Sequence, residues 1–472
     1  MDKFSAHQKV VLSIILASYF IIILDVSVVI TGLPKILAEL HFSSTSLSWV
    51  QSAYTLMFGG FLLLGARAGD ILGRKKMYLT GLSIFILTSL MISMAHTPEV
   101  MLSARAIQGI GAAILAPSTL ALLSTNFADG QERSRAMAYY SSIAGLGATV
   151  GLVAGGVFAD LLSWRVGFFI NVPLGLILFF TALKSLKETE KHTGKFDLTG
   201  AVTSTIGMSA LVFGIVNSAT DGWTGTVTLS AIIIGLILLM LFVLNERSAP
   251  QPIMPLRLLA HRVRAGAYIS RIFYLGGMVG FFFFITQYLQ LVKGFTPFAA
   301  GIAFMPMTLV NFVAAIQAQR LSRKWGNTRL LSYGLMITFA GIFCLTYITA
   351  DTNYVTGIAL PMILIGIGQG LAFAPMTVFG VHEVDLKDTG AASGLVNVAH
   401  QMGNSLGLGI LVVIFETSVR STADTPALLA QRVANTMTMS SLMILCSFLA
   451  VIILIARKPK VAGELQAGVN HE

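Results

Sequence analysis

The chain has 472 residues, of which 55% are hydrophobic and only 11% charged, with a mean hydropathy of +0.80 and a net charge of +10. Soluble chains carry about a quarter charged residues, so this composition excludes a soluble globular protein and indicates a polytopic membrane protein. Because the cations lie in short loops between apolar runs, membrane topology explains the positive charge, and we expect no nucleic-acid partner. The two cysteines stand apart within apolar runs, and we expect no metal site.

Apolar runs of about 17–25 residues, each long enough to cross a bilayer as a helix, predict an all-α protein with fourteen spans. The runs lie near 10–32, 48–66, 77–95, 100–123, 136–159, 165–185, 200–218, 226–244, 267–291, 299–319, 328–349, 355–378, 392–415 and 436–456. With this count, most of the 31 Lys and Arg residues fall on the side of the two termini. Cations are retained on the cytoplasmic side, so we expect both termini there.

Two strongly charged residues, Asp25 in the first run and Arg105 in the fourth, are predicted to lie deep in the membrane. A charge there costs at least about 2.5 kcal/mol, so its default interpretation is a functional or paired group. Both lie about 10 Å from the outer ends of their spans, and we expect them to interact directly or through a polar network. We expect Asp25 to exchange a proton, its ionisation set by burial and by Arg105; a static ion pair is the alternative.

A short cationic turn, Gly65 to Lys76, links the second and third runs. Its charges cannot lie in hydrocarbon, so it is predicted to be a turn at the membrane face. Glycines near Asp70, among them Gly73, allow two helix ends to approach closely, and Arg74 follows directly. A loop that only sets the topology would explain the cations but not the glycines and the aspartate.

The fifth run carries Gly147, Gly151 and Gly155 at four-residue spacing, with Gly156 next to the last of them. One helix face is therefore bare of side chains and can approach another helix closely. Two interpretations remain open: static packing, or a smooth face on which two halves of the protein slide.

An internal repeat divides the chain. The turn at 65–76 has a degenerate echo at 320–329, and Gly109–Thr119 resembles Ile367–Thr377 at nearly the same offset. We therefore expect two six-helix bundles, residues 1–190 and 251–472, and an inserted two-helix hairpin within 191–250. Parallel repeats of this kind place a substrate site between the halves near the middle of the membrane.

Uncharged polar or aromatic residues within the spans are candidates for lining that site. Each polar residue alone is as well explained by bridging two helices, and each phenylalanine of the run 281–284 by facing lipid. The candidates are Tyr54, Gln108, Phe283, Gln287, Asn311, Gln369, Asn397, His400 and Gln401.

Together these features resemble the major facilitator superfamily and, within it, the fourteen-span drug:proton antiporters (EmrB/QacA-like exporters). The turn matches the superfamily loop that latches the two halves, which implies that role for Gly65, Asp70, Gly73 and Arg74. The segment from Arg105 to Gly111 matches the span-four motif associated with proton coupling. Further matching segments are Leu24–Val29 with Leu33–Pro34, Trp164–Gly175, Asp197–Gly200 and Gly390–Gly394.

Two departures qualify the resemblance. Gly151 is followed by Leu152 where the antiporter motif has a proline, and the later spans lack the extra buried carboxylates of exporters of divalent organic cations. An apolar, neutral or monovalent substrate is therefore expected.

The resemblance implies proton-driven export of lipophilic small molecules across the bacterial cytoplasmic membrane by alternating access. A dedicated exporter of one metabolite or natural product is the alternative, and proton-coupled import is a third reading. We expect a monomer surrounded by lipid, no cofactor beyond the proton gradient, and no enzyme activity, because no catalytic motif is present.

Overall fold

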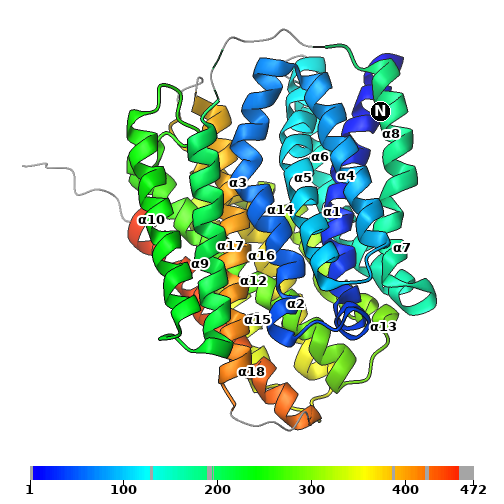
Figure 1. Cartoon of the computed structure of the whole chain (residues 1–472), viewed down its shortest axis with the longest axis vertical. Helices are drawn as coiled ribbons and strands as arrows, with labels where there is room; N and C mark the ends of the chain where they lie inside the picture. Colours follow the sequence, from blue (N-terminus) through cyan, green and yellow to red (C-terminus); the bar gives the residue numbers. More distant parts are fainter. Residues whose placement is uncertain are drawn as a thin grey trace, which may run out of the picture.

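The computed structural model describes residues 4–127, 131–188, 194, 196–384, 388–419 and 425–456, in which all regular structure is helical (Figure 1). The principal helices are α1 (Ala6–Leu40), α2 (Ser44–Leu47), α3 (Trp49–Leu72), α4 (Arg74–Ser93), α5 (Pro98–Asn126), α6 (Gln131–Val157), α7 (Trp164–Phe169), α8 (Asn171–Ser185), α9 (Leu198–Asp221), α10 (Thr226–Ser248), α11 (Arg257–Ala260), α12 (Arg262–Gln287), α13 (Pro297–Ala303), α14 (Met305–Trp325), α15 (Asn327–Cys344), α16 (Leu360–Gly380), α17 (Thr389–Thr417) and α18 (Pro426–Ala450).

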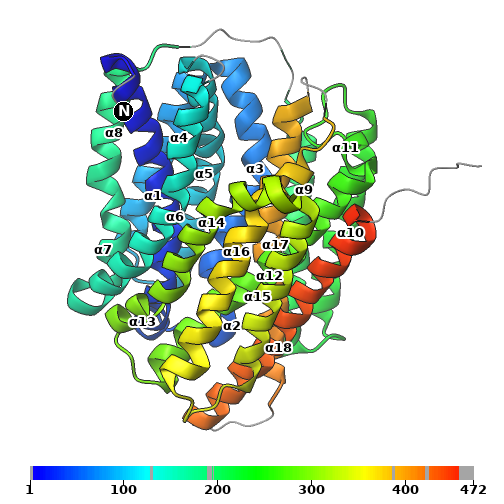
Figure 2. The same cartoon turned by 180° about the vertical axis from the view of Figure 1, so that it is seen from behind.

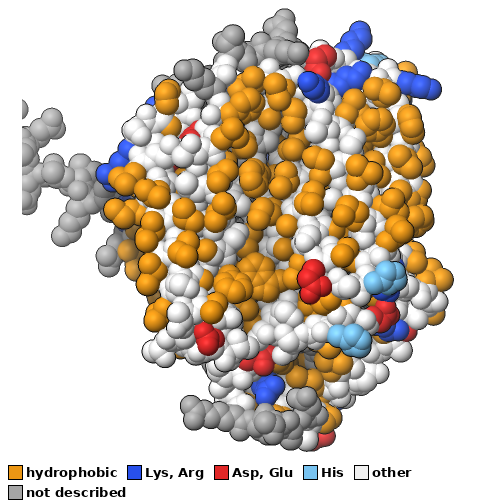
Figure 3. Space-filling model, viewed as in Figure 1, with side chains coloured by type: hydrophobic (Ala, Val, Ile, Leu, Met, Phe, Trp, Pro, Cys, Tyr) orange, Lys and Arg blue, Asp and Glu red, His pale blue; other side chains and the backbone are white. Residues whose placement is uncertain are grey.

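Each predicted span coincides with a helix or with two consecutive helices. Thirteen helical segments in the described residues are long and apolar enough to cross a membrane. The fifth predicted span is α6, which has 27 residues; the apolar stretch here, Gly147–Leu162, runs past the end of α6 at Val157 and is shorter than the other thirteen segments. Hydrophobic side chains cover the face seen in Figure 3, as expected for a surface in contact with lipid.

The helices form two bundles with a hairpin beside them. Helices α1 and α3–α8 pack together, and so do α12 and α14–α18, while α9 and α10 pack mainly on each other (Figures 1 and 2). The predicted domain boundaries at 190 and 250 stay predictions, since the packing does not define them to the residue.

The hairpin lies across a seam between the bundles, because α9 contacts both α3 and α17. The same two helices are joined directly by a hydrogen bond between the hydroxyls of Thr55 and Ser405, 2.7 Å apart. On the other side of the molecule, α6 contacts α13 and α14. These two seams enclose the space between the bundles.

The predicted turn at 65–76 is much shorter than expected. Helix α3 continues to Leu72 and α4 begins at Arg74, so only Gly73 interrupts them, with a φ of +107° that favours glycine. Gly65 lies inside α3, where a Cβ atom would lie 2.2 Å from the backbone oxygen of Ala113, so its lack of a side chain lets α3 approach α5.

Candidate functional site

Asp25 and Arg105 form a direct ion pair between α1 and α5. Nη1 of Arg105 lies 2.6 Å from Oδ2 of Asp25, and each residue is only 1% exposed. The other carboxylate oxygen, Oδ1, accepts hydrogen bonds from the side-chain amides of Gln108 and Asn171, both at 2.9 Å. The carboxylate is therefore held by three donors from two helices, α5 and α8.

Arg105 is equally well partnered. Its Nε donates to the backbone oxygen of Val50 at 2.9 Å, its Nη1 also donates to Gln108, and its guanidinium lies 4.4 Å from the ring centroid of Tyr54. Gln108 donates in turn to the hydroxyl of Ser89 on α4. The result is a charge-compensated network that joins five helices of the N-terminal bundle, α1, α3, α4, α5 and α8.

Sequence reasoning found the two charges of this network but not all their partners. Asn171 was noticed only as part of a motif, and Ser89 was not noticed at all. A buried amide at the start of an apolar span was the signal for Asn171, whereas a single serine in a span carries none.

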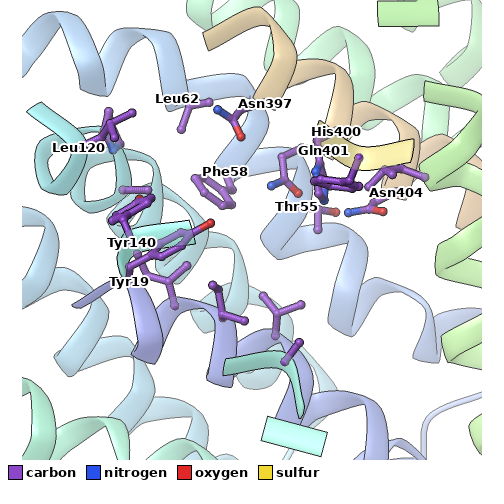
Figure 4. A pocket seen from close by; sticks show the side chains of 18 of the residues that line it. Tyr19, Thr55, Phe58, Leu62, Leu120, Tyr140, Asn397, His400, Gln401 and Asn404 are labelled. Carbon is purple, nitrogen blue, oxygen red and sulfur yellow. The ribbon is translucent and has the colours of Figure 1, made fainter. Parts of the chain in front are cut away.

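A cavity of about 860 Å³ lies between the two bundles. Figure 4 shows Tyr19 and Tyr140 on one side of it and Asn397, His400 and Gln401 on the other. Expected residues that line it are Tyr54, Phe283, Asn311, Gln369, Asn397, His400 and Gln401. Their part in substrate binding stays a prediction.

Gln108 and Gln287 do not line this cavity, contrary to expectation. Gln108 is turned into the Asp25 network, where its amide bonds to Arg105, Asp25 and Ser89. Gln287 is buried and donates to the backbone oxygen of Phe283, one helical turn earlier. The phenylalanine run does not face lipid: Phe281, Phe283 and Phe284 are buried, and Phe282 and Phe283 contact the cavity.

The cavity reaches the end of the molecule that holds the N-terminus. Asp70, Arg74 and Arg133 line it there. At the opposite end the bundles meet, because Nε2 of Gln290 donates to the backbone oxygen of Thr31 at 2.9 Å and α13 packs on α6. The structure thus has one open end and one closed end.

The predicted gate residues lie at the open end. Arg74 and Asp70 form an ion pair of 3.1 Å, and Arg74 also donates to the backbone oxygen of Ala121 on α5. Glu188, which sequence reasoning missed, accepts from the backbone nitrogens of Lys75 and Lys76 at 3.0 Å and so caps α4. The latch between the halves stays a prediction, since these bonds join the loop to its own half.

The glycines of α6 divide between two partners. Gly147, Gly151 and Gly155 lie against α1 of the same bundle, as static packing requires. Gly156 lies against α13 of the other bundle, where a Cβ atom would be 2.6 Å from the backbone oxygen of Pro297. Leu152, at the family's proline position, sits in continuous helix, and a Cβ atom on Gly301 of α13 would be 2.5 Å from its backbone oxygen.

A third buried charge was misplaced by sequence reasoning. Arg271 lies near the start of the predicted run at 267–291 and is counted with the cations on the side of the termini, but α12 begins at Arg262, so Arg271 lies well inside the helix and is only 4% exposed. Its Nη1 donates to the hydroxyl of Thr377 at 3.0 Å, and its guanidinium lies 4.5 Å from the ring centroid of Phe373. The expectation of only two deep charges is therefore wrong.

Two helical bundles around a cavity that is open at one end are the architecture of a membrane transporter. The chain belongs to the Major Facilitator Superfamily, whose family model matches residues 15–408. It is 34% identical to the cephamycin export protein CmcT of Amycolatopsis lactamdurans, over 96% of this chain and 93% of the relative. It is 35% identical to the puromycin resistance protein pur8 of Streptomyces alboniger, over 89% and 83% of the two chains.

Solved structures support the fold. A bacterial homologue of the human lysosomal transporter Spinster, in an inward-facing and unoccupied conformation, matches with a TM-score of 0.69. The match covers 97% of this chain and 100% of that one at 14% sequence identity, so it shows the fold alone. The family match confirms the predicted superfamily, the structural match confirms the all-helical fold, and the chain is a multi-pass membrane protein.

Proposed function

We propose that this protein exports lipophilic small molecules across the bacterial cytoplasmic membrane in exchange for protons. The observation that carries the proposal is the Asp25 network, a fully buried carboxylate joined through Arg105 to Tyr54, which lines the cavity. Buried intramembrane carboxylates are the usual sites of proton exchange in transporters. Relatives whose names describe export and antibiotic resistance support outward transport of a small molecule.

The network couples a proton to helix packing. Protonation of Asp25 removes the negative charge that holds Arg105, so the contacts of α1 with α5 and α8 lose their electrostatic component. If protonation favours one arrangement of the bundles and substrate binding favours the other, a proton enters as a substrate leaves. Opening of the closed end requires α6 to separate from α13, where Gly156 and Gly301 allow close contact.

The distribution of Lys and Arg residues favours a topology with both termini in the cytoplasm. With both termini in the cytoplasm, the open end of the cavity faces the cytoplasm and takes up substrate there. We propose a monomer that needs the proton gradient and no cofactor.

The test uses liposomes that contain a pH-sensitive dye and the native protein, with a panel of unrelated lipophilic compounds. We expect several compounds to cause proton release through the native protein. The control variant Asp221→Asn, which changes an exposed carboxylate at the end of α9, is expected to behave in the same way. Asp25→Asn is expected to bind the same compounds without moving protons. A response to one chemical class alone would favour a dedicated exporter.

Proton release by the Asp25→Asn protein equal to that of the native protein would contradict the coupling role. A native protein that moves no compound would contradict export itself. Asp25→Glu, which keeps the carboxylate, separates loss of coupling from misfolding, because it is expected to retain part of the proton flux.

A further inference from the structure

The environment of Arg271 differs from that of an ordinary buried ion pair. No carboxylate of the described residues lies within ion-pairing distance of its guanidinium, and its Nε has no hydrogen-bond partner. Its partners are the hydroxyl of Thr377, the ring of Phe373 and Nδ1 of His400 at 3.4 Å. A buried cation that is only partly solvated by neutral groups attracts an anion strongly, because the low dielectric constant does not screen it.

A purely structural role is the competing interpretation, and Arg264 shows what that role looks like. Arg264 lies two turns earlier on α12 and is 7% exposed. Its guanidinium donates to the backbone oxygens of Leu258, His382 and Glu383, which anchors the loop after α16. Arg271 makes no comparable set of bonds to the backbone in the described structure.

Arg271 stands directly behind the cavity wall. Two of its three partners, Phe373 and His400, line the cavity. Arginine can only donate, so Nδ1 of His400 accepts from it and a neutral ring carries its proton on Nε2. No residue of the described structure accepts a hydrogen bond from that N–H, so it is available to a ligand.

Away from its mouth, the cavity has no described lining residue with a carboxylate that could pair with a cation. Asp70 is the only carboxylate among its described lining residues, and it lies at the mouth in an ion pair with Arg74. Asp25 is behind the wall and is neutralised by Arg105. The charges around the cavity are therefore positive on balance, while most of the lining is apolar and aromatic.

We propose that the cavity selects lipophilic compounds that carry an anionic group such as a carboxylate. Arg271 supplies the positive charge and orients His400, and His400 donates a hydrogen bond from Nε2 to the anion. The inference rests on the proposed function, because it names the class of small molecule that the exporter takes.

The experiment measures binding of 1-pyrenebutyrate and its methyl ester to the full-length protein in phosphatidylcholine nanodiscs by pyrene fluorescence, corrected with empty nanodiscs. The two probes differ by one charge. We expect the native protein to prefer the acid at least about tenfold, since hydrogen bonds to charged groups contribute about 1.5–3 kcal/mol. Arg271→Gln is expected to bind both probes alike, and Arg271→Lys to restore part of the preference.

Arg264→Gln is the matched control, a second buried arginine of α12, and it is expected to keep the preference for the acid. Equal binding of acid and ester by the native protein, or an unchanged preference in Arg271→Gln, would overturn the proposal. An anionic lipid headgroup has the same chemistry, so the measurement is repeated with phosphatidylglycerol. Loss of the preference there would assign Arg271 to lipid and overturn the assignment to a solute.

Failure of this inference is distinguishable from failure of export. Binding in nanodiscs needs no transport, so a carboxylate preference can be found in a protein that moves no protons. Conversely, native protein that releases protons with neutral or cationic compounds and binds acid and ester alike would keep the exporter and remove the anion site.

Discussion

The two bundles each bury an arginine beneath an aromatic ring, yet they treat its charge differently. Arg105 lies 4.4 Å from the ring centroid of Tyr54 and Arg271 lies 4.5 Å from that of Phe373. Arg105 has a carboxylate partner, Asp25, whereas Arg271 has only neutral partners in the described structure. The N-terminal bundle thus holds a complete ion pair, on which a proton can act, while the C-terminal bundle leaves a positive charge without a carboxylate partner in the described structure.

The largest expected effect comes from breaking the complete pair. Arg105→Met leaves the Asp25 carboxylate buried without its counter-ion, which costs about 3–5 kcal/mol. We expect a large fall in the thermal unfolding midpoint of the detergent-purified protein, followed by tryptophan fluorescence. In the double variant Asp25→Asn, Arg105→Met, most of this loss is expected to return, since no charge stays unpaired. A double variant as unstable as the single one would show that the charge is not the cause.

A second prediction concerns contact between the bundles rather than within one of them. Gly156→Leu places a side chain where α6 meets α13, so the closed end of the cavity is expected to open. We expect transport to fall about tenfold or more, because alternating access needs both closed states.

A labelling experiment checks whether the closed end has opened. A cysteine is introduced at Val26, which lines the cavity, in a Cys344→Ser, Cys446→Ser background; with Gly156→Leu it should react faster with a membrane-impermeant reagent added outside. Gly409→Ala, in α17, where a Cβ atom would make only ordinary contacts of 3.4 Å or more, is the control. Unchanged transport and labelling would contradict a gate at this contact.

Sequence reasoning succeeded where membrane physics leaves few choices. Apolar runs that are long enough to cross a bilayer predict transmembrane helices. Asp25 and Arg105 were expected to lie close together because they are at the same depth in antiparallel spans. It failed for Arg271 because this residue lies near the start of the predicted run at 267–291 and is counted with the cations of the membrane face, whereas α12 begins nine residues before Arg271 and carries it into the bundle. It failed for Gln108 and Gln287 because depth alone does not say whether a polar side chain faces a cavity or a neighbouring helix. Rotation about the helix axis is decided by packing between distant segments.

A smaller effect on stability is expected from removing the aromatic rings that lie next to the two arginines. Phe373→Leu removes the ring next to Arg271, which has no carboxylate partner in the described structure. Tyr54→Leu removes the ring next to Arg105, which is paired with Asp25. Cation–π contacts contribute about 0.5–2 kcal/mol and more when the cation is desolvated. We therefore expect Phe373→Leu to lower the free energy of unfolding more than Tyr54→Leu does, measured by denaturant unfolding in mixed micelles. The reverse order would mean that Arg271 depends little on its ring.

The smallest expected effect is the most informative about the comparison. Arg271→Met removes a buried charge without leaving a carboxylate unpaired in the described structure, and it also removes the cost of taking that charge out of water. We expect the free energy of unfolding without ligand to change by less than about 1 kcal/mol, in contrast to the large loss in Arg105→Met. The measurement compares the two variants in the same micelles, with thermal midpoints as a second readout. A loss in Arg271→Met as large as that in Arg105→Met would show that Arg271 holds the C-terminal bundle together, and the two arginines would then have the same role.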